Sequence, residues 1–237
     1  MSIGGSVTRA RGLGLLVAAS VLLSGCANVV SGSALRDERA VPMNVPPLRE
    51  SQLDDLLLSV DELNSIAGST AMELALDLDE MSETSRDVSD PECLGALFGA
   101  ERQVYGDDWS AVRDQVIRDP GDDKDHWTEQ TVVLYPSERQ AAKFVADSAE
   151  AWEQCGGFSV SIDDHESSYI WQLDPSNVQG DYVTQTGTQE DSDGWECQHA
   201  LVPVSNVVVE TWACAYGIGD EGIEMARRIV ANALKPA

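Results

Sequence analysis

Apolar residues recur at helical spacing near both ends of the chain and once in its middle. Residues 59–68 begin with a capping box (SVDE) and end at a glycine. Residues 137–155 and 220–234 each repeat apolar side chains every three or four positions after a capping Ser or Asp. A shorter helix is expected at 92–98, where a glycine ends the apolar run.

Alternation of apolar and polar residues predicts the strands. Residues 72–81 (MELALDLDEM) alternate apolar with mostly acidic side chains, which is typical of a strand with one buried face. Segments 195–204 and 207–215 flank Ser205-Asn206 and predict a hairpin. Further strands are expected at 109–118, 127–135, 158–162, 169–173 and 181–186. This order of elements predicts an α+β fold, an antiparallel twisted sheet with helices packed on one face.

Residues 1–25 have the pattern of an export signal. Two arginines precede an apolar run of about 12 residues, which spans about 18 Å and is too short for a bilayer core of roughly 30 Å. The run ends in Leu-Ser-Gly-Cys26, which resembles the lipobox of bacterial lipoproteins, whose cysteine is diacylated and becomes the new N-terminus. Two acyl chains anchor a protein stably. We therefore expect lipidation of Cys26 and attachment to the extracytoplasmic face of the cell membrane, with a plain secretory signal as the alternative.

Residues 26–49 contain Ser, Gly and Pro with little periodicity and are interpreted as a flexible tether for a folded domain at 50–237. A segment packed along that domain is the alternative. The chain has 15 Lys+Arg against 41 Asp+Glu, a net charge of −26, which becomes −28 without the two signal-peptide arginines. So acidic a surface repels nucleic-acid phosphates, and no nucleic-acid partner is expected.

The cysteines predict two disulfides. Assigning Cys26 to lipid leaves four of the five, an even number that is typical of exported disulfide proteins. In a hairpin with a two-residue turn, Cys197 and Cys214 are equally distant from the turn and face each other within disulfide range. Cys93 then pairs with Cys155. A zinc site at Cys197 and His199 is the weaker alternative, because two further ligands are missing.

No motif in the sequence indicates catalysis. The chain contains no G-x-S-x-G, H-E-x-x-H or Walker A pattern, so we expect no enzymatic activity and no cofactor. A hydrolase whose triad assembles in space around His126 or His199 stays open as an alternative. The acidic stretches 119–125, 163–164 and 190–193 are interpreted as solvated loops rather than calcium sites, and no metal is expected.

Aromatic residues supply the candidate ligand contacts. Three of the six tryptophans lie on apolar faces and are expected in the core: Trp127, Trp152 and Trp212. The other three lie beside polar or glycine-containing stretches and are candidates to line a ligand cleft: Trp109, Trp171 and Trp195. His199, which the hairpin register places opposite Trp212, is a fourth candidate. A buried, hydrogen-bonded role is the favoured interpretation of this histidine.

Five segments, in order, resemble the extracellular sensor domain of actinobacterial Ser/Thr protein kinases of the PknH type. They are LLLSVDELNSIAG (56–68), DPECLGAL (90–97), HWTEQTVVLYPSERQAAKFV (126–145), WEQCGG (152–157) and CQHAL (197–201). The resemblance covers roughly residues 50–237 and includes the four cysteine positions. In this family the domain also occurs on its own in lipoproteins. It implies an antiparallel sheet with packed helices, two disulfides and a groove that binds an unidentified ligand.

Two departures from those kinases shape the expected function. The sequence has no kinase domain and no spanning helix, so we expect that it does not signal inward by itself. Acidic loops at 119–125 and 190–193 disfavour an anionic ligand if they border the groove. We expect a lipid-anchored cell-envelope domain that binds a small molecule or an envelope component without catalysis. The alternatives are an envelope hydrolase and a protein-binding scaffold.

Overall fold

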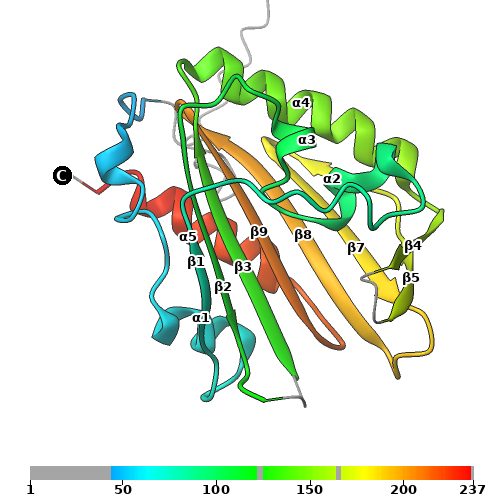
Figure 1. The fold of residues 1–237 in the computed structure, drawn as a ribbon. Coiled ribbons are helices and arrows are strands. Elements are labelled where there is room, and N and C mark those ends of the chain that lie inside the picture. Colours follow the sequence, from blue (N-terminus) through cyan, green and yellow to red (C-terminus); the bar gives the residue numbers. More distant parts are fainter. Residues whose placement is uncertain (1–43, 122–124, 164–166, 236–237) are drawn as a thin grey trace, which may run out of the picture. The chain divides into compact units, whose positions relative to one another are not determined.

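A computed structural model describes residues 44–121, 125–163 and 167–235. The expected signal peptide, Cys26 and most of the expected tether lie outside the described residues. The described part is built on a nine-stranded sheet whose strands all pair antiparallel (Figure 1). Its strand order is β1-β2-β3-β9-β8-β7-β5-β4, and β6 also pairs with β7.

Every predicted helix and strand is present, in the predicted order. The strands are β1 (Glu73–Leu78), β2 (Ala111–Arg118), β3 (His126–Leu134), β4 (Ser159–Asp163), β5 (Ser168–Leu173), β6 (Asn177–Gln179), β7 (Tyr182–Gln189), β8 (Trp195–Val204) and β9 (Val207–Tyr216). The helices are α1 (Val60–Ala67), α2 (Leu94–Leu97), α3 (Arg102–Tyr105), α4 (Glu138–Cys155) and α5 (Glu221–Asn232), with short 3-10 turns η1 (Glu50–Gln52) and η2 (Pro91–Cys93). The pattern analysis did not predict α3, β6 or η1.

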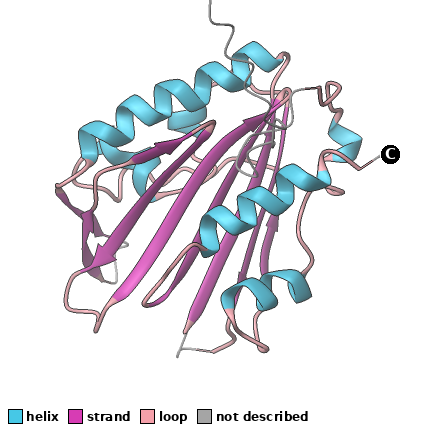
Figure 2. Cartoon of the chain, turned by 180° about the vertical axis from the view of Figure 1, so that it is seen from behind, coloured by secondary structure: helices cyan, strands magenta, loops and turns pink. Residues whose placement is uncertain are grey.

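The predicted antiparallel sheet with packed helices and two disulfides is confirmed. Helices α2, α3 and α4 lie over one face, as Figure 1 shows. The prediction is incomplete in one respect, because α1 and α5 cover the opposite face, which Figure 2 shows from behind. Strands β2, β3, β8 and β9 carry buried apolar residues on both sides, so each face requires a cover.

Local signals define the helix ends. At the start of α1, Ser59 Oγ accepts from the backbone N–H of Glu62, whose carboxylate accepts from the Ser59 N–H at 2.9 Å. Gly68 ends the helix with φ 73°, in the left-handed region that glycine enters without steric cost. Ser137 caps α4 through the Gln140 N–H. The Asp220 side chain makes no capping hydrogen bond at α5, so the cap expected there is not formed.

Strand β1 exists, but the predicted burial of its leucine face is wrong. Leu74 and Leu76 are 46% and 51% exposed. The pairing register shifts between them, so Leu74 lies opposite Ile117 and Leu76 opposite Val116. Ile117 and Val116 are adjacent on β2 and point to opposite faces. The irregularity therefore places the two leucines on different sides of an edge strand, where neither is covered.

The chain is fixed to the domain before the end of the expected tether. Leu48 is buried, and its N–H donates to Asn206 Oδ1 at 2.7 Å. Its carbonyl oxygen accepts from Asn206 Nδ2, which also donates to the Tyr135 carbonyl oxygen. Asn206 belongs to the β8–β9 turn, so this turn anchors residue 48. Within the described residues, no helix has the length and apolar character needed to cross a membrane.

Candidate functional site

Strand register assembles polar side chains on the sheet face beneath α4. The β8–β9 hairpin has the predicted two-residue turn, and His199 lies opposite Trp212 as the sequence predicts. Trp212 in turn lies opposite Glu129 of β3, and the next row along the strands contains Asp114, Thr131 and Glu210. Residues far apart in sequence thus form two adjacent rows across four strands.

His199 has the buried, hydrogen-bonded position that the sequence favours. Its ring is fully buried and lies between the rings of Trp152 and Trp212, with centroid separations of 4.0 Å on both sides. Burial lowers the pKa of His199, which favours the neutral ring at neutral pH. Nε2 then donates to Glu210 Oε1, and the two atoms are 2.9 Å apart. The histidine ring therefore packs against one face of the Trp212 ring.

Glu210 joins the α2–α3 segment to the sheet. Its Oε2 accepts from the Ala100 N–H at 3.0 Å and from the Tyr105 hydroxyl at 2.8 Å. Ala100 is buried with φ 51°, a left-handed conformation that costs free energy in a residue with a side chain. Bonds to an ionised carboxylate are among the stronger hydrogen bonds and offset such strain. This carboxylate thus positions the loop that follows α2.

Two carboxyl groups lie close together beside this link. Burial raises the pKa of Asp114 to about 6, although Thr131 donates a hydrogen bond to Asp114 Oδ1 at 2.6 Å. Burial, followed by the nearby charge of Asp114, raises the pKa of Glu129 well above its usual range, and the two carboxyls share a hydrogen bond. Burial also raises the pKa of Glu101. Among the described residues, no Lys or Arg forms an ion pair with any of these carboxyls.

An apolar pocket of about 290 Å³ opens at the end of this face. Its lining is largely aromatic and aliphatic, with one charged side chain: Leu97, Phe98, Trp127, Glu129, Ile162, Trp171, Leu173, Gly187, Trp195, Cys197, Trp212 and Cys214. The volume lies near the lower end of the range for small-molecule sites. We name it the tryptophan pocket, because four of its lining residues are tryptophans.

Gly99 allows the charged residue of the pocket to approach the backbone. A Cβ at this position would lie 2.6 Å from Glu129 Oε1 and 3.5 Å from Trp212 Cδ1. No side chain larger than hydrogen fits there unless the carboxylate moves. Glu129 is 9% exposed, and it lines the pocket beside Trp212.

Two of the four predicted contact residues lie in the pocket. Trp171 and Trp195 line it, whereas His199 lies behind Trp212 and Trp109 is elsewhere, with its indole N–H donating to the Gly106 carbonyl oxygen. Two further tryptophans line the pocket, Trp127 and Trp212, which the sequence analysis expected in the core. Trp212 is buried as expected, and Trp127 is half-buried and packs against the same cluster. Alternation identifies the side of a strand on which a residue lies, but not whether that side is covered there.

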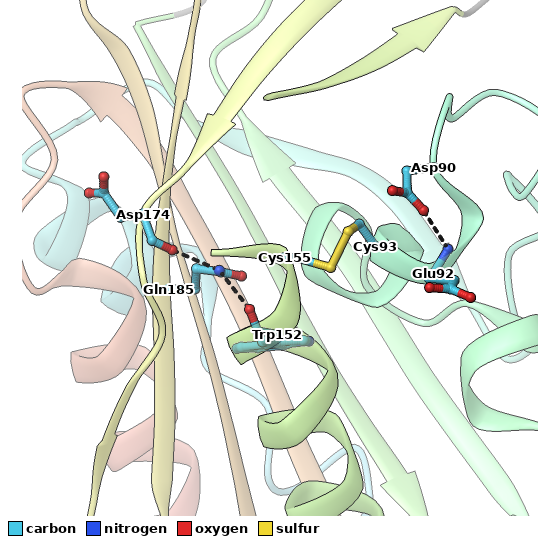
Figure 3. Close-up of a disulfide and its surroundings, with 7 residues drawn as sticks. All are labelled: Asp90, Glu92, Cys93, Trp152, Cys155, Asp174 and Gln185. Carbon is cyan, nitrogen blue, oxygen red and sulfur yellow. Dashed lines mark hydrogen bonds between the residues drawn. A yellow bond between two sulfur atoms is a disulfide. The ribbon is translucent and has the colours of Figure 1, made fainter. Parts of the chain in front are cut away.

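Both disulfides join residues on the pocket face, in the pairing predicted from the sequence. Cys197 and Cys214 are opposite each other on β8 and β9, with Cα atoms 4.0 Å apart, and they line the pocket. Cys93 and Cys155 join the start of α2 to the end of α4 (Figure 3). Next to this second bridge, Gln185 Nε2 donates to the carbonyl oxygens of Trp152 and Asp174.

The hydrolase alternative finds little support in the histidine geometry. His126 Nδ1 lies 2.9 Å from Asp119 Oδ2, and Ser69 Oγ donates to Asp119 Oδ1 at 3.0 Å. The aspartate stands between the serine and the histidine, whereas a triad requires the nucleophile to bond the histidine. No serine hydroxyl bonds His126 or His199 in the part of the chain that the structure describes. Over the same part, no group of His, Cys, Asp and Glu is arranged to hold a metal ion.

The chain matches a family model described as the PknH-like extracellular domain over residues 48–232. Serine/threonine-protein kinase PknH from Mycobacterium bovis and from Mycobacterium tuberculosis (strain H37Rv) are each 34% identical to it over 194 residues. These alignments cover 81% of this chain but 33% and 31% of the two kinases, so the chain matches about a third of their length. The matches confirm the resemblance that the five segments indicate.

A solved structure agrees at the level of the fold. The crystal structure of the extracellular domain of PknH from Mycobacterium tuberculosis matches with a TM-score of 0.78 and 33% sequence identity. The match covers 81% of this chain and 100% of that domain. The similarity therefore extends over the sheet and helices that build the tryptophan pocket.

Proposed function

Because the chain belongs to the family of PknH-like extracellular domains, we propose that it is a sensor-like binding domain of the cell envelope. It binds a small molecule in the tryptophan pocket and catalyses no reaction. The observation that carries this proposal is the pocket itself, in which four tryptophans surround about 290 Å³ of space. Aromatic rings left facing a cavity gain most by covering an apolar ligand.

A disulfide and a buried hydrogen bond hold the walls of the pocket. The Cys197–Cys214 bridge fixes one side of it, and the Glu210 carboxylate holds the backbone at Ala100, next to the wall residues Leu97 and Phe98. A site whose walls are held in place loses little conformational entropy when a ligand enters. Binding rather than chemical conversion is also consistent with the serine and histidine positions described above.

Native mass spectrometry of the protein purified from its own envelope tests the binding proposal. We expect a species heavier than the same protein measured after denaturation, which retains any covalent lipid, by the mass of one small molecule. The Trp171→Ala variant should lose that species, because it removes one pocket wall, whereas Trp109→Ala should retain it. Equal native and denatured masses in every preparation would contradict small-molecule binding and favour a protein partner.

Membrane attachment is a separate part of the proposal. A diacylated Cys26 would hold the domain on the extracytoplasmic face, since two acyl chains give stable anchoring. The Cys26→Ala variant should therefore leave the membrane fraction and appear in the soluble envelope or the medium. Retention of this variant in membranes at the level of the unchanged protein would contradict the anchor.

A further inference from the structure

We propose that the tryptophan pocket selects an organic cation, namely a quaternary or tertiary ammonium group on a small apolar body. The inference rests on the proposed function, because it names the ligand class for the same pocket. The face of an aromatic ring attracts a cation, and tryptophan does so most strongly. Four tryptophans lining one pocket thus provide the surface that such a group requires: Trp127, Trp171, Trp195 and Trp212.

The charge of the lining distinguishes this ligand class from others. Glu129 is its one charged residue, and no Lys, Arg or His is part of it. Arg118 pairs with Trp127 across β2 and β3 but does not line the pocket. An anionic ligand would therefore find no counter-charge there. A cation would find both an aromatic surface and a carboxyl group.

Glu129 is placed to meet that cation. The strand register sets it opposite Trp212, and one carboxylate oxygen lies against the backbone at Gly99. The residue is nine-tenths buried, and it is part of the pocket lining. In such a poorly hydrated position, an ion pair with a ligand is far stronger than at the surface.

The residues behind Glu129 strengthen the preference. Asp114, Glu210 and Glu101 contribute negative charge to its surroundings, and none of these groups has a Lys or Arg partner among the described residues. An ionised carboxylate in this setting is costly unless a positive charge is supplied. A bound ammonium group would supply that charge and so would favour ionisation of Glu129.

The pocket also opens at an acidic end of the sheet. The turn at 119–121 and 125 follows β2 next to Trp127, and the turn at 190–194 precedes Trp195. Asp125 in the first turn and Glu190, Asp191 and Asp193 in the second are exposed acids, in a chain whose net charge is −26. Such a field raises the local concentration of cations and lowers that of anions.

Three compounds of nearly the same shape test the charge preference. Choline, 3,3-dimethylbutan-1-ol and 3,3-dimethylbutanoate carry a positive, a neutral and a negative charge, respectively. Binding to the full protein is followed by tryptophan fluorescence, since four of six tryptophans line the pocket, and by calorimetry. We expect choline to bind at least about tenfold more tightly than the alcohol, and the carboxylate to bind weakest.

A matched pair of variants separates Glu129 from the general acidity of the protein. Glu129→Gln should reduce choline affinity about tenfold and leave the affinity for the alcohol unchanged, because only the local charge is removed. Asp191→Asn removes one exposed charge from the 190–194 turn and should change choline affinity less than about twofold in moderate salt. Asn tolerates the left-handed backbone that Asp191 has, with φ 54°.

The pH dependence provides a second readout. The groups that face Glu129 are Asp114 from β2, Glu210 from β9 and Glu101 from the start of α3. Because burial raises the pKa of Glu129 and of Asp114, choline affinity should rise as the pH increases past about 6, the pKa of Asp114, while affinity for the alcohol stays constant. Glu129→Gln should reduce the rise.

The outcomes separate this inference from the proposed function. If the alcohol binds as tightly as choline, or if Glu129→Gln leaves choline affinity unchanged, the cation preference is wrong, while small-molecule binding in the pocket stands. If none of the compounds binds at high millimolar concentration, the cation preference is also wrong. Native mass spectrometry of the envelope-purified protein then still decides the proposed function by itself.

Discussion

The two faces of the central sheet use the same strands for different purposes. On β9, Val207, Val209 and Ala213 point to the side of α5, whereas Glu210 and Trp212 point to the side of α4. The α5 face is closed by apolar contacts, including fully buried Val202 of β8 and Ile229 of α5. The α4 face contains the buried carboxyls and the open tryptophan pocket. Neighbouring residues of one strand therefore differ in role: one packs in the apolar α5 core, and the next lies on the face of the carboxyls and the pocket.

The features that cost folding free energy lie mainly on the α4 face. Buried carboxyls, a left-handed alanine and a buried Trp212 indole N–H with no acceptor among the described residues all lie on the α4 face. Both disulfides described above also lie on that face. The α5 face needs no such covalent support, because its apolar side chains pack directly against the sheet. Concentration of unfavourable features on one face is typical of a functional surface.

Of the changes considered, removal of a disulfide should lower the unfolding free energy most. The Cys93→Ala/Cys155→Ala variant should lose about 4 kcal/mol of unfolding free energy, because the bridge joins residues that are 62 apart in sequence. Urea denaturation measures the loss, and hydrogen exchange locates it. We expect faster exchange in α2 and α3 than in α5. Equal acceleration on both faces would contradict the view that the bridge supports mainly the pocket face.

A cavity on the closed face should lower stability without altering the pocket. Ile229→Ala should cost about 3 kcal/mol, because the side chain is fully buried in the α5 core. Tryptophan fluorescence and choline binding of the folded variant should match those of the unchanged protein. The contrasting variant is Ile162→Ala, which removes a half-buried pocket residue and should cost about 1 kcal/mol while weakening ligand binding. If Ile229→Ala weakened choline binding and Ile162→Ala did not, the two faces would not differ in the way proposed.

Neutralising Asp114 should give a smaller effect, visible only at higher pH. The pKa of this carboxyl is about 6 in the folded protein, against 3.8 when unfolded. As pH rises from about 4 to about 6, the unfolded chain releases this proton first, so the contribution of Asp114 to stability falls. Asn does not titrate and can still accept the Thr131 hydrogen bond.

Asp114→Asn should therefore be more stable than the unchanged protein by about 2 kcal/mol near pH 7.5, and about equally stable near pH 4. Urea denaturation at the two pH values measures the difference, with Asp191→Asn as the exposed control. A stability gain of the same size at both pH values would show that packing, rather than ionisation, limits stability at this site.

Local sequence signals account for much of the fold and for part of the site. The capping box at Ser59, the two-residue turn at Ser205-Asn206 and the pairing of Cys197 with Cys214 all depend on nearby residues, and each is correctly predicted. The bulged edge strand β1 is not, because its exposure depends on the register with β2. The position of Trp127 and Trp212 beside the pocket is not predicted for the same reason, since their surroundings come from other strands and from the segment after α2.

The sequence alone determined most of the elements, the hairpin register and both disulfides. These follow from periodicity, turn chemistry and cysteine spacing, which act between neighbouring or paired residues. The family was indicated separately, by the resemblance of five segments to known sensor domains. Only the tertiary structure decided which tryptophans face open space, and that Glu129 lies among them with Asp114, Glu210 and Glu101 behind it. The physical reason is that burial and electrostatic environment are properties of the whole packed molecule. Side chains from β3, β5, β8 and β9 must come together before a pocket exists.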